Sequence, residues 1–229
     1  MPPAIARDGN RMMGTKAKIF IVDDHPLVRE WLANLIEKNS DLTVCGEAEG
    51  AATALEAIAE VQPDLAIIDL SLGSDSGIDL IRSIRSSFPN VAMIVLSMHD
   101  ERVYAERAIR AGARGYVMKR ESTKKIIGAI HEVLQGNLYL SKEMTELLVE
   151  KFMSSEPVGL PLAQLSDREL EVFKLIGQGY EINEIAKTLN VNHKTIHTYC
   201  TRIKEKLKLA SSAELLREAL RSAETRAPV

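Results

Sequence analysis

Residues with reactive polar side chains follow four apolar runs in the N-terminal part of this 229-residue chain. The acids Asp23 and Asp24 follow one run, and Asp69, Ser97 and Lys119 each close another. The runs are apolar throughout, which is typical of strands buried on both faces of a parallel sheet. Because the carboxyl ends of such strands meet in one crevice, we expect these side chains to face a common point.

Carboxylates, a hydroxyl and an ammonium group at one point suit a divalent cation and a phosphoryl group. Mg²⁺ takes oxygen ligands and keeps several waters, so Asp24 and Asp69 are candidate direct ligands and Asp23 a ligand through water. A carboxylate also serves as a nucleophile that forms an aspartyl phosphate, and the central position of Asp69 suits that role. Lys119 would supply positive charge to the phosphoryl oxygens, and Ser97 a hydrogen bond.

Each of these residues also has an ordinary structural explanation. An aspartate at a strand-to-helix junction is usually a helix N-cap. We interpret Asp100 as such a cap and Asp64 as a turn residue at the start of a strand. It is the combination of acids, hydroxyl and lysine on four different strands that favours a site.

Alternating strand and helix patterns must position these side chains. The predicted strands cover residues 19–22, 42–46, 65–68, 91–96 and 116–118. The predicted helices cover residues 26–38, 51–61, 77–87, 100–111 and 122–134. Strands separated by helices of about 10–15 residues favour right-handed crossovers and a doubly wound α/β sheet.

The segments IVDDH, IIDLSLGSDSG, VLSMHD and GYVMK, in that order, resemble the receiver domain of two-component response regulators. The resemblance covers roughly residues 17–136 and implies a flavodoxin-like α/β fold with a five-stranded parallel sheet. It implies that a sensor histidine kinase phosphorylates Asp69. It also implies that Asp24, Asp69 and the backbone carbonyl of Ser71 ligate Mg²⁺.

The same resemblance implies roles for residues around this point. Ser97 and Tyr116 correspond to the switch pair, in which the hydroxyl turns toward the phosphoryl group and the ring moves inward. Ser71 and His99 occupy positions that tune dephosphorylation in the family. Gly73 is a departure, because the family often has proline there, and it predicts a more mobile loop after the phosphoacceptor.

The pattern becomes entirely helical after residue 136. Residues 137–161 contain one more helical segment and a linker-like stretch rich in Ser, Pro and Gly. Residues 162–229 predict an all-α four-helix domain, whose first helix opens with a capping box between Ser166 and Glu169. Residues 1–16 read as a flexible extension.

The third helix of this tail predicts an exposed face that is basic and rich in hydroxyls. Between Asn192 and Lys208 five basic residues stand against one acid. A helix, a short turn and such a helix suit entry into the major groove of DNA. The candidate DNA contacts are Lys194, His197, Thr198, Thr201, Arg202 and Lys204.

A small helical bundle that binds protein is the alternative, and helical spacing alone does not separate the two. The segment LSDRELEVFKLIGQGYEINEIAKTLNVNHKTIHTY, with IKEKLKL after it, resembles the helix-turn-helix domain of the NarL/FixJ/LuxR class and favours DNA. The family often has lysine at His197 and valine at Thr198, and some members have lysine at Thr201. With fewer cations at these positions, we expect weaker binding to the DNA phosphates and a change in the bases that are preferred.

Composition bounds the remaining possibilities. No apolar stretch approaches the ~20 residues that a membrane span needs, and the N-terminal segment lacks the apolar core of a signal peptide. Cys45 and Cys200 are expected to be free thiols in a reducing compartment. These features predict a cytoplasmic protein without a membrane partner.

The sequence thus predicts a response regulator and transcription factor rather than an enzyme. Phosphorylation of Asp69 is expected to favour a homodimer on double-stranded DNA, and the inactive form to occlude the recognition helix against the receiver. An adaptor whose helical tail binds protein is the alternative. A phosphatase that forms an aspartyl phosphate is the other rival, but such enzymes commonly place a second catalytic aspartate where this chain has Ser71.

Overall fold

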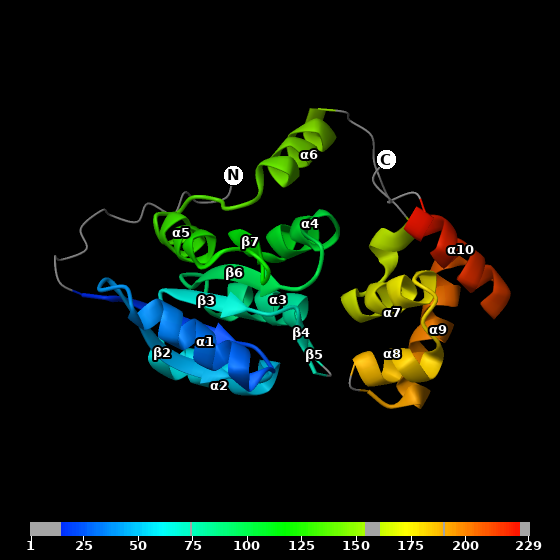
Figure 1. Ribbon diagram of the computed structural model, residues 1–229, viewed down its shortest axis with the longest axis horizontal. Coiled ribbons are helices and arrows are strands. Elements are labelled where there is room, and N and C mark those ends of the chain that lie inside the picture. The colour runs from blue at the N-terminus through cyan, green and yellow to red at the C-terminus, as the bar shows by residue number, and fades with distance from the viewer. Residues whose placement is uncertain (1–14, 74, 154–160, 190, 225–229) are drawn as a thin grey trace.

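The central sheet of the protein has five parallel strands and matches the flavodoxin-like prediction (Figure 1). The computed structural model describes residues 15–73, 75–153, 161–189 and 191–224. The strands, in spatial order, are β2 (Leu42–Ala48), β1 (Ala17–Val22), β3 (Leu65–Ile68), β6 (Ala92–Ser97) and β7 (Gly115–Met118). A short antiparallel hairpin of β4 (Ser71–Leu72) and β5 (Asp75–Ser76) follows β3 and was not predicted.

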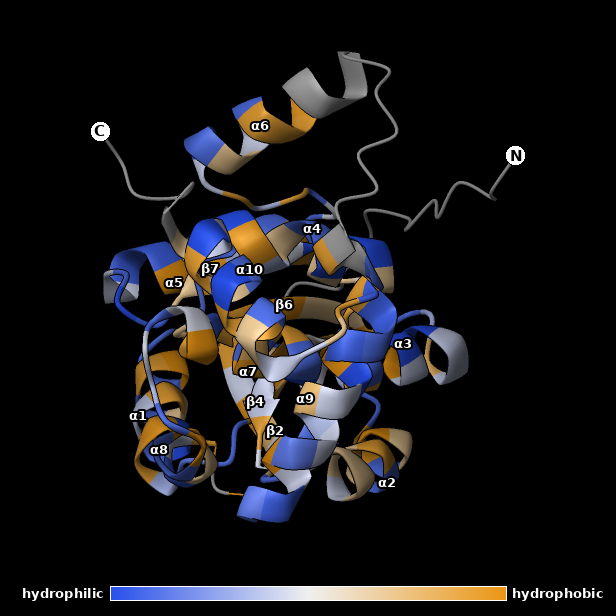
Figure 2. Cartoon of the chain, turned by 90° about the vertical axis from the view of Figure 1, so that its right-hand side faces the viewer, coloured by the Kyte–Doolittle hydropathy of each residue, from blue (hydrophilic) through white to orange (hydrophobic). Residues whose placement is uncertain are grey.

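Six helices precede the linker, and the first five begin and end within one residue of the predicted positions. They are α1 (Pro26–Glu37), α2 (Ala51–Val61), α3 (Gly77–Ser87), α4 (Glu101–Ala111), α5 (Thr123–Leu134) and α6 (Lys142–Met153). Buried side chains of α1 and α5 pack on one face of the sheet, and those of α2, α3 and α4 on the other. The helices therefore cover both faces of the sheet with their apolar sides, as in a doubly wound fold (Figure 2).

The alternation of side chains along β1 explains how both faces are filled. Ile19 and Ile21 join the core under α1 and α5, whereas Phe20 and Val22 join the core under α2, α3 and α4. Successive side chains on a strand point to opposite faces, so a continuous apolar run is needed. In the sheet register Val22 pairs with Ile68, so β1 and β3 end level with each other.

The second half of the described chain is helical. After a short 3-10 helix η1 (Pro161–Gln164), the helices are α7 (Asp167–Gly177), α8 (Ile182–Thr188), α9 (His193–Leu207) and α10 (Ser212–Glu224). Helices α7 and α10 approach so closely that a Cβ atom on Gly177 would lie 2.5 Å from the carbonyl oxygen of Ala219. The four predicted helices are confirmed. The predicted linker lies outside the described residues except at Pro161.

No helix among the described residues has the length and apolar character required to cross a bilayer. Cys45 and Cys200 are both free thiols.

The capping box of α7 supports a prediction about acid stability. Glu169 is buried, accepts a 2.6 Å hydrogen bond from the backbone N–H of Ser166, and accepts another of 2.6 Å from Lys206 Nζ. Burial opposes ionisation, but the hydrogen bonds from Lys206 and Ser166 outweigh it and hold the pKa of Glu169 below its ordinary value. A lowered folded pKa adds stability above the unfolded pKa, and this is lost as the pH falls through the folded pKa.

We therefore expect Glu169→Gln to lower the free energy of unfolding by about 1–2 kcal/mol at pH 7. The deficit should shrink below the unfolded glutamate pKa of about 4.3. Urea unfolding followed by circular dichroism, at pH 7 and at a pH below about 4.3, measures this deficit. The control is Glu205→Gln, at an exposed position on α9. A deficit that stays constant with pH would contradict the proposed charge dependence.

Candidate functional site

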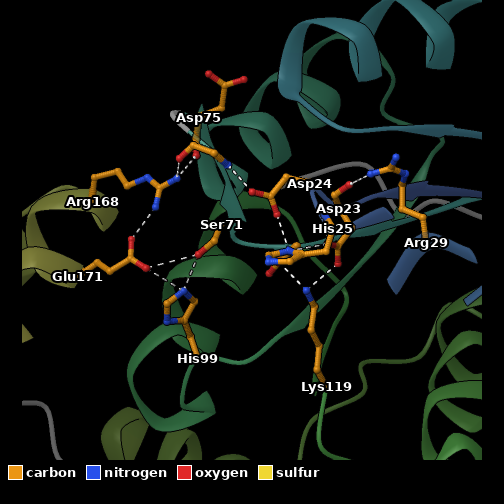
Figure 3. A network of polar contacts seen from close by, with 12 residues as sticks. Asp23, Asp24, His25, Arg29, Ser71, Asp75, His99, Lys119, Arg168 and Glu171 are labelled. Atoms are coloured by element: carbon orange, nitrogen blue, oxygen red, sulfur yellow. Dashed lines mark hydrogen bonds and ion pairs between the residues drawn. The ribbon is translucent and has the colours of Figure 1, made fainter. Parts of the chain in front are cut away.

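An acidic cluster lies at the carboxyl ends of β1 and β3. Ligand atoms of Asp23, Asp24, His25 and Asp69 lie within 4.8 Å of one another. Figure 3 shows the first three of these residues beside Lys119. Asp23 is 2% exposed and Asp69 is 4% exposed. The level ends of β1 and β3 bring the acids together, as the sequence predicts.

Lys119 bridges two of these acids directly. Its Nζ lies 2.6 Å from Asp23 Oδ2 and 2.6 Å from Asp69 Oδ2. Its backbone N–H donates a 2.8 Å hydrogen bond to the carbonyl of Ser97, which fixes the end of β7 beside the end of β6. The structure thus joins the predicted lysine to the predicted acids.

The burial of this cluster shifts the ionisation of its members. Burial raises the pKa of Asp69, and the adjacent Lys119 opposes this only in part. Burial lowers the pKa of Lys119, but Asp69 and Asp23 more than compensate, so that the pKa is raised. Three carboxylates around one ammonium group leave an excess of negative charge, which favours a bound cation.

The donor set fits a small, hard divalent cation. Asp69 Oδ1 is buried and finds no hydrogen-bond partner among the described residues, so an oxygen ligand is available. Carboxylate oxygens are the ligands that Mg²⁺ prefers. His25 was not predicted, although it directly follows the acidic pair; its Nδ1 lies 2.7 Å from Asp24 Oδ1.

The predicted switch pair meets at one backbone segment. Tyr116 O–H donates a 2.9 Å hydrogen bond to the carbonyl of His99, and the N–H of His99 donates a 3.3 Å hydrogen bond to Ser97 Oγ. The sequence predicts an inward movement of the Tyr116 ring, whereas in this structure the ring is already buried. Burial raises the pKa of Tyr116 far above its ordinary value, so its hydroxyl remains a donor.

Gly73 has a conformational role in the β4–β5 hairpin. Its φ is +56°, and its backbone N–H donates a 2.9 Å hydrogen bond to Asp24 Oδ2. Proline, whose φ stays near −65° and which has no N–H, can satisfy neither condition. The departure from the family therefore forms a defined turn that supports the acidic cluster.

We expect Gly73→Pro to destabilise the protein by more than about 1 kcal/mol, because it removes this donor and forbids the observed φ. Gly73→Ala keeps the N–H and isolates the strain of the left-handed conformation, which costs about 1–2 kcal/mol. Chemical denaturation of the three proteins measures both effects. A proline variant as stable as the parent chain would exclude this role of the turn.

Side chains of α7 reach the loop after Asp69, and sequence reasoning missed them. Glu171 Oε1 lies 3.3 Å from His99 Nε2 and accepts a 3.4 Å hydrogen bond from Ser71 Oγ, while Ser71 Oγ and His99 Nε2 lie 2.8 Å apart. Burial opposes ionisation of Glu171, but His99 and Arg168 outweigh it and lower the pKa of its carboxyl. Because about a hundred residues separate these groups along the chain, no local pattern indicates the contact.

The predicted DNA-contact residues lie together on α9. Lys194, His197, Thr198, Thr201 and Arg202 are exposed, and Lys204 is half-buried. The side chain of Asn192 caps the helix by accepting a 2.9 Å hydrogen bond from the N–H of Lys194.

Most of the predicted contact face of α9 is exposed. Arg202 and Tyr199 line a cleft of about 420 Å³ together with residues of α2 and α3, but the rest of the predicted contact face is open. Most of that face is therefore exposed in this structure, and the predicted occlusion of this helix in the inactive form stays a prediction. Side chains of α7 make hydrogen bonds to the receiver.

Known families match both halves of the chain. Residues 19–131 match the response regulator receiver domain, and residues 163–219 match the luxR family of bacterial regulatory proteins. The oxygen regulatory protein NreC of Staphylococcus carnosus is 35% identical over 210 residues, which cover 89% of this chain and 97% of that protein. NreC of Staphylococcus epidermidis is 34% identical over 211 residues, with the same coverage of both chains.

Solved structures agree with this assignment. A LuxR-family two-component response regulator from Aurantimonas sp. SI85-9A1 is 33% identical with a TM-score of 0.57, covering 61% of this chain and 99% of that chain. RcsB from Salmonella enterica serovar Typhimurium, bound to a promoter in the presence of the phosphomimetic BeF3-, is 28% identical with a TM-score of 0.56. That match covers 89% of this chain and 98% of RcsB. The chain therefore belongs to the family of two-component response regulators that join a receiver domain to a LuxR-type helix-turn-helix DNA-binding domain.

Proposed function

We propose that Asp69 accepts a phosphoryl group from a sensor histidine kinase and thereby controls dimerisation and DNA binding by this transcription regulator. The observation that carries the proposal is the buried Asp69 carboxylate beside a second acid and within 2.6 Å of Lys119 Nζ. In the transfer, an Asp69 oxygen bonds to phosphorus while the phosphorus–nitrogen bond to the kinase histidine breaks. The histidine nitrogen keeps the electron pair.

The side chains around Asp69 have complementary roles in this transfer. Lys119 places a positive charge beside the phosphoryl oxygens, and Ser97 donates a hydrogen bond to one of them. Mg²⁺, when bound, supplies charge that neutralises the phosphoryl oxygens. Asp24, Asp69 and the backbone carbonyl of Ser71 would hold it directly, and Asp23 through water.

The proposed organisation follows the order of these parts along the chain. Residues 17–136 form the receiver and residues 162–229 the DNA-binding domain, with a helix and linker at 137–161 and an extension at 1–16. We infer that the exposed residues of α9 contact double-stranded DNA, since a basic helix of a helix-turn-helix enters the major groove. The RcsB dimers bound to DNA support a homodimer as the binding form. A regulator of this kind acts in the cytoplasm.

Selection from random duplex DNA, with and without beryllofluoride and Mg²⁺, tests the proposal. Enrichment of an inverted repeat that strengthens with the phosphoryl mimic is the expected result, because a symmetric dimer reads two half-sites. If a protein that binds the mimic enriches no sequence, the helical domain has an output other than DNA. Sustained hydrolysis of a phosphate ester by the full chain would instead point to a phosphatase.

A further inference from the structure

The DNA-binding domain docks on the receiver through η1 and α7. Arg107 of α4 donates hydrogen bonds to the backbone carbonyls of Leu165 at 2.9 Å and Leu162 at 2.6 Å. Lys174 Nζ lies 4.3 Å from the centre of the Tyr104 ring, also on α4. The contact therefore uses the helix that directly follows the loop of Ser97 and His99.

A second set of contacts brings α7 to the β4–β5 hairpin (Figure 3). Arg168 donates to the backbone carbonyls of Gly73 and, at 3.1 Å, of Asp75. Its other nitrogen lies 2.7 Å from Glu171 Oε2, which orients that carboxylate. Glu171 Oε1 then faces Ser71 and His99, as described above. The side chain of Glu171 is 12% exposed, so water screens its charge weakly.

His99 joins this contact to the switch residues. Its ring faces Glu171 and Ser71, while its backbone N–H and carbonyl are bonded to Ser97 Oγ and Tyr116 O–H. When the Ser97 hydroxyl turns toward a phosphoryl group, it leaves the N–H of His99. His99, which contacts Glu171, then loses one of the two hydrogen bonds that hold its backbone.

We propose that Glu171 is a positioning residue that couples docking of the DNA-binding domain to phosphoryl chemistry at Asp69. This inference rests on the proposed function of Asp69. In the docked state the Glu171 carboxylate accepts a hydrogen bond from Ser71, two residues from the phosphoacceptor. Its negative charge opposes the arrival of a dianionic phosphoryl group at Asp69. Phosphorylation in turn weakens the contacts of Glu171 and releases α7.

The two effects are one coupling free energy. If docking disfavours the phosphoryl group by a given factor, the phosphoryl group disfavours docking by the same factor. Such couplings typically change affinities by about 5- to 150-fold. The DNA-binding domain thus sets how readily the receiver is phosphorylated, in addition to responding to it.

The test measures phosphorylation of the full chain by acetyl phosphate and Mg²⁺ as a time course of intact mass. Transfer forms the bond from Asp69 to phosphorus and releases acetate, so each event adds one phosphoryl group. We expect Glu171→Gln to be phosphorylated about 5-fold faster or more than the parent chain. Glu205→Gln, which removes a carboxylate from the exposed surface of α9, should match the parent chain.

Two further variants separate positioning from a general effect on folding. Arg107→Ala removes the hydrogen bonds to Leu162 and Leu165 without altering Glu171, and should also accelerate phosphorylation. In a Ser71→Ala background, Glu171→Gln should accelerate phosphorylation much less, because the Ser71 hydroxyl that Glu171 contacts is already absent. Fluorescent labels on α2 and α8 should move apart when beryllofluoride binds the parent chain.

The outcomes distinguish the two proposals. A parent chain that is never phosphorylated would overturn the proposed function itself. A phosphorylated parent chain whose rate equals that of both Glu171→Gln and Arg107→Ala would overturn the coupling alone. An equal acceleration by Glu171→Gln with and without Ser71 would show that Glu171 does not act through the Ser71–His99 pair.

Discussion

We expect Asp69→Asn to abolish the response of this protein to a phosphodonor. The amide cannot form the acyl phosphate, while its size preserves the packing at the end of β3. We expect no phosphorylation by acetyl phosphate or by a cognate kinase. Dimerisation and DNA affinity should then stay at the unphosphorylated level whatever the phosphodonor concentration. Intact mass and size-exclusion chromatography with light scattering measure the two effects.

The matched control lies at the other end of the same strand. Asp64 precedes β3 and accepts a 2.9 Å hydrogen bond from the N–H of Lys18, far from the cluster at the carboxyl end. Asp64→Asn should therefore be phosphorylated and should dimerise like the parent chain. An Asp69→Asn protein that still dimerises with a phosphodonor would move the acceptor to another residue.

Charge reversal at Lys194 and Arg202 is expected to remove DNA binding. Both side chains are exposed on α9, on the face that would enter the groove. Each substitution removes a cation and places an anion against the phosphates, so affinity should fall at least about 100-fold at moderate salt. The dependence of affinity on salt should also become shallower, by about one unit of slope for each lost contact.

A pair of reversals outside the DNA-binding domain controls for net charge. Lys124→Glu on α5 with Lys142→Glu on α6 changes the total charge equally at exposed positions. That variant should retain most of its DNA affinity, and both variants should still be phosphorylated at Asp69. Fluorescence anisotropy with a selected duplex gives the affinities. Unchanged binding by the Lys194 and Arg202 variant would exclude this face of α9.

Local chemistry is sufficient to predict much of this fold from the sequence. The apolar run at residues 65–68 coincides with β3, and the helix at residues 51–61 coincides with α2. Each reflects a short-range rule, because a doubly buried strand must be apolar on both faces and a helix needs a stripe at its own period. The capping box of Ser166 and Glu169 is likewise set within four residues.

The acidic cluster was also predictable, since parallel strands bring their carboxyl ends together. Asp23, Asp24, Asp69 and Lys119 each follow a strand. Because β1 and β3 end level with each other, these side chains come close together in the fold. The assignment to a receiver and a LuxR-type domain follows from motifs of the same local kind. Sequence alone thus determined the fold class, the family, and the acids and lysine of the cluster, but not His25.

Only the tertiary structure decided how the two halves meet. The strands of the β4–β5 hairpin have two residues each, too short for any periodicity, and the turn at Gly73 depends on a bond to Asp24. The contacts of Arg168 and Glu171 with the receiver join positions separated by about a hundred residues. Periodicity records which side of an element is buried, but not which distant element covers it. The arrangement of α7 over the Ser71 loop, and the exposure of α9, therefore follow only from the packing of the folded chain.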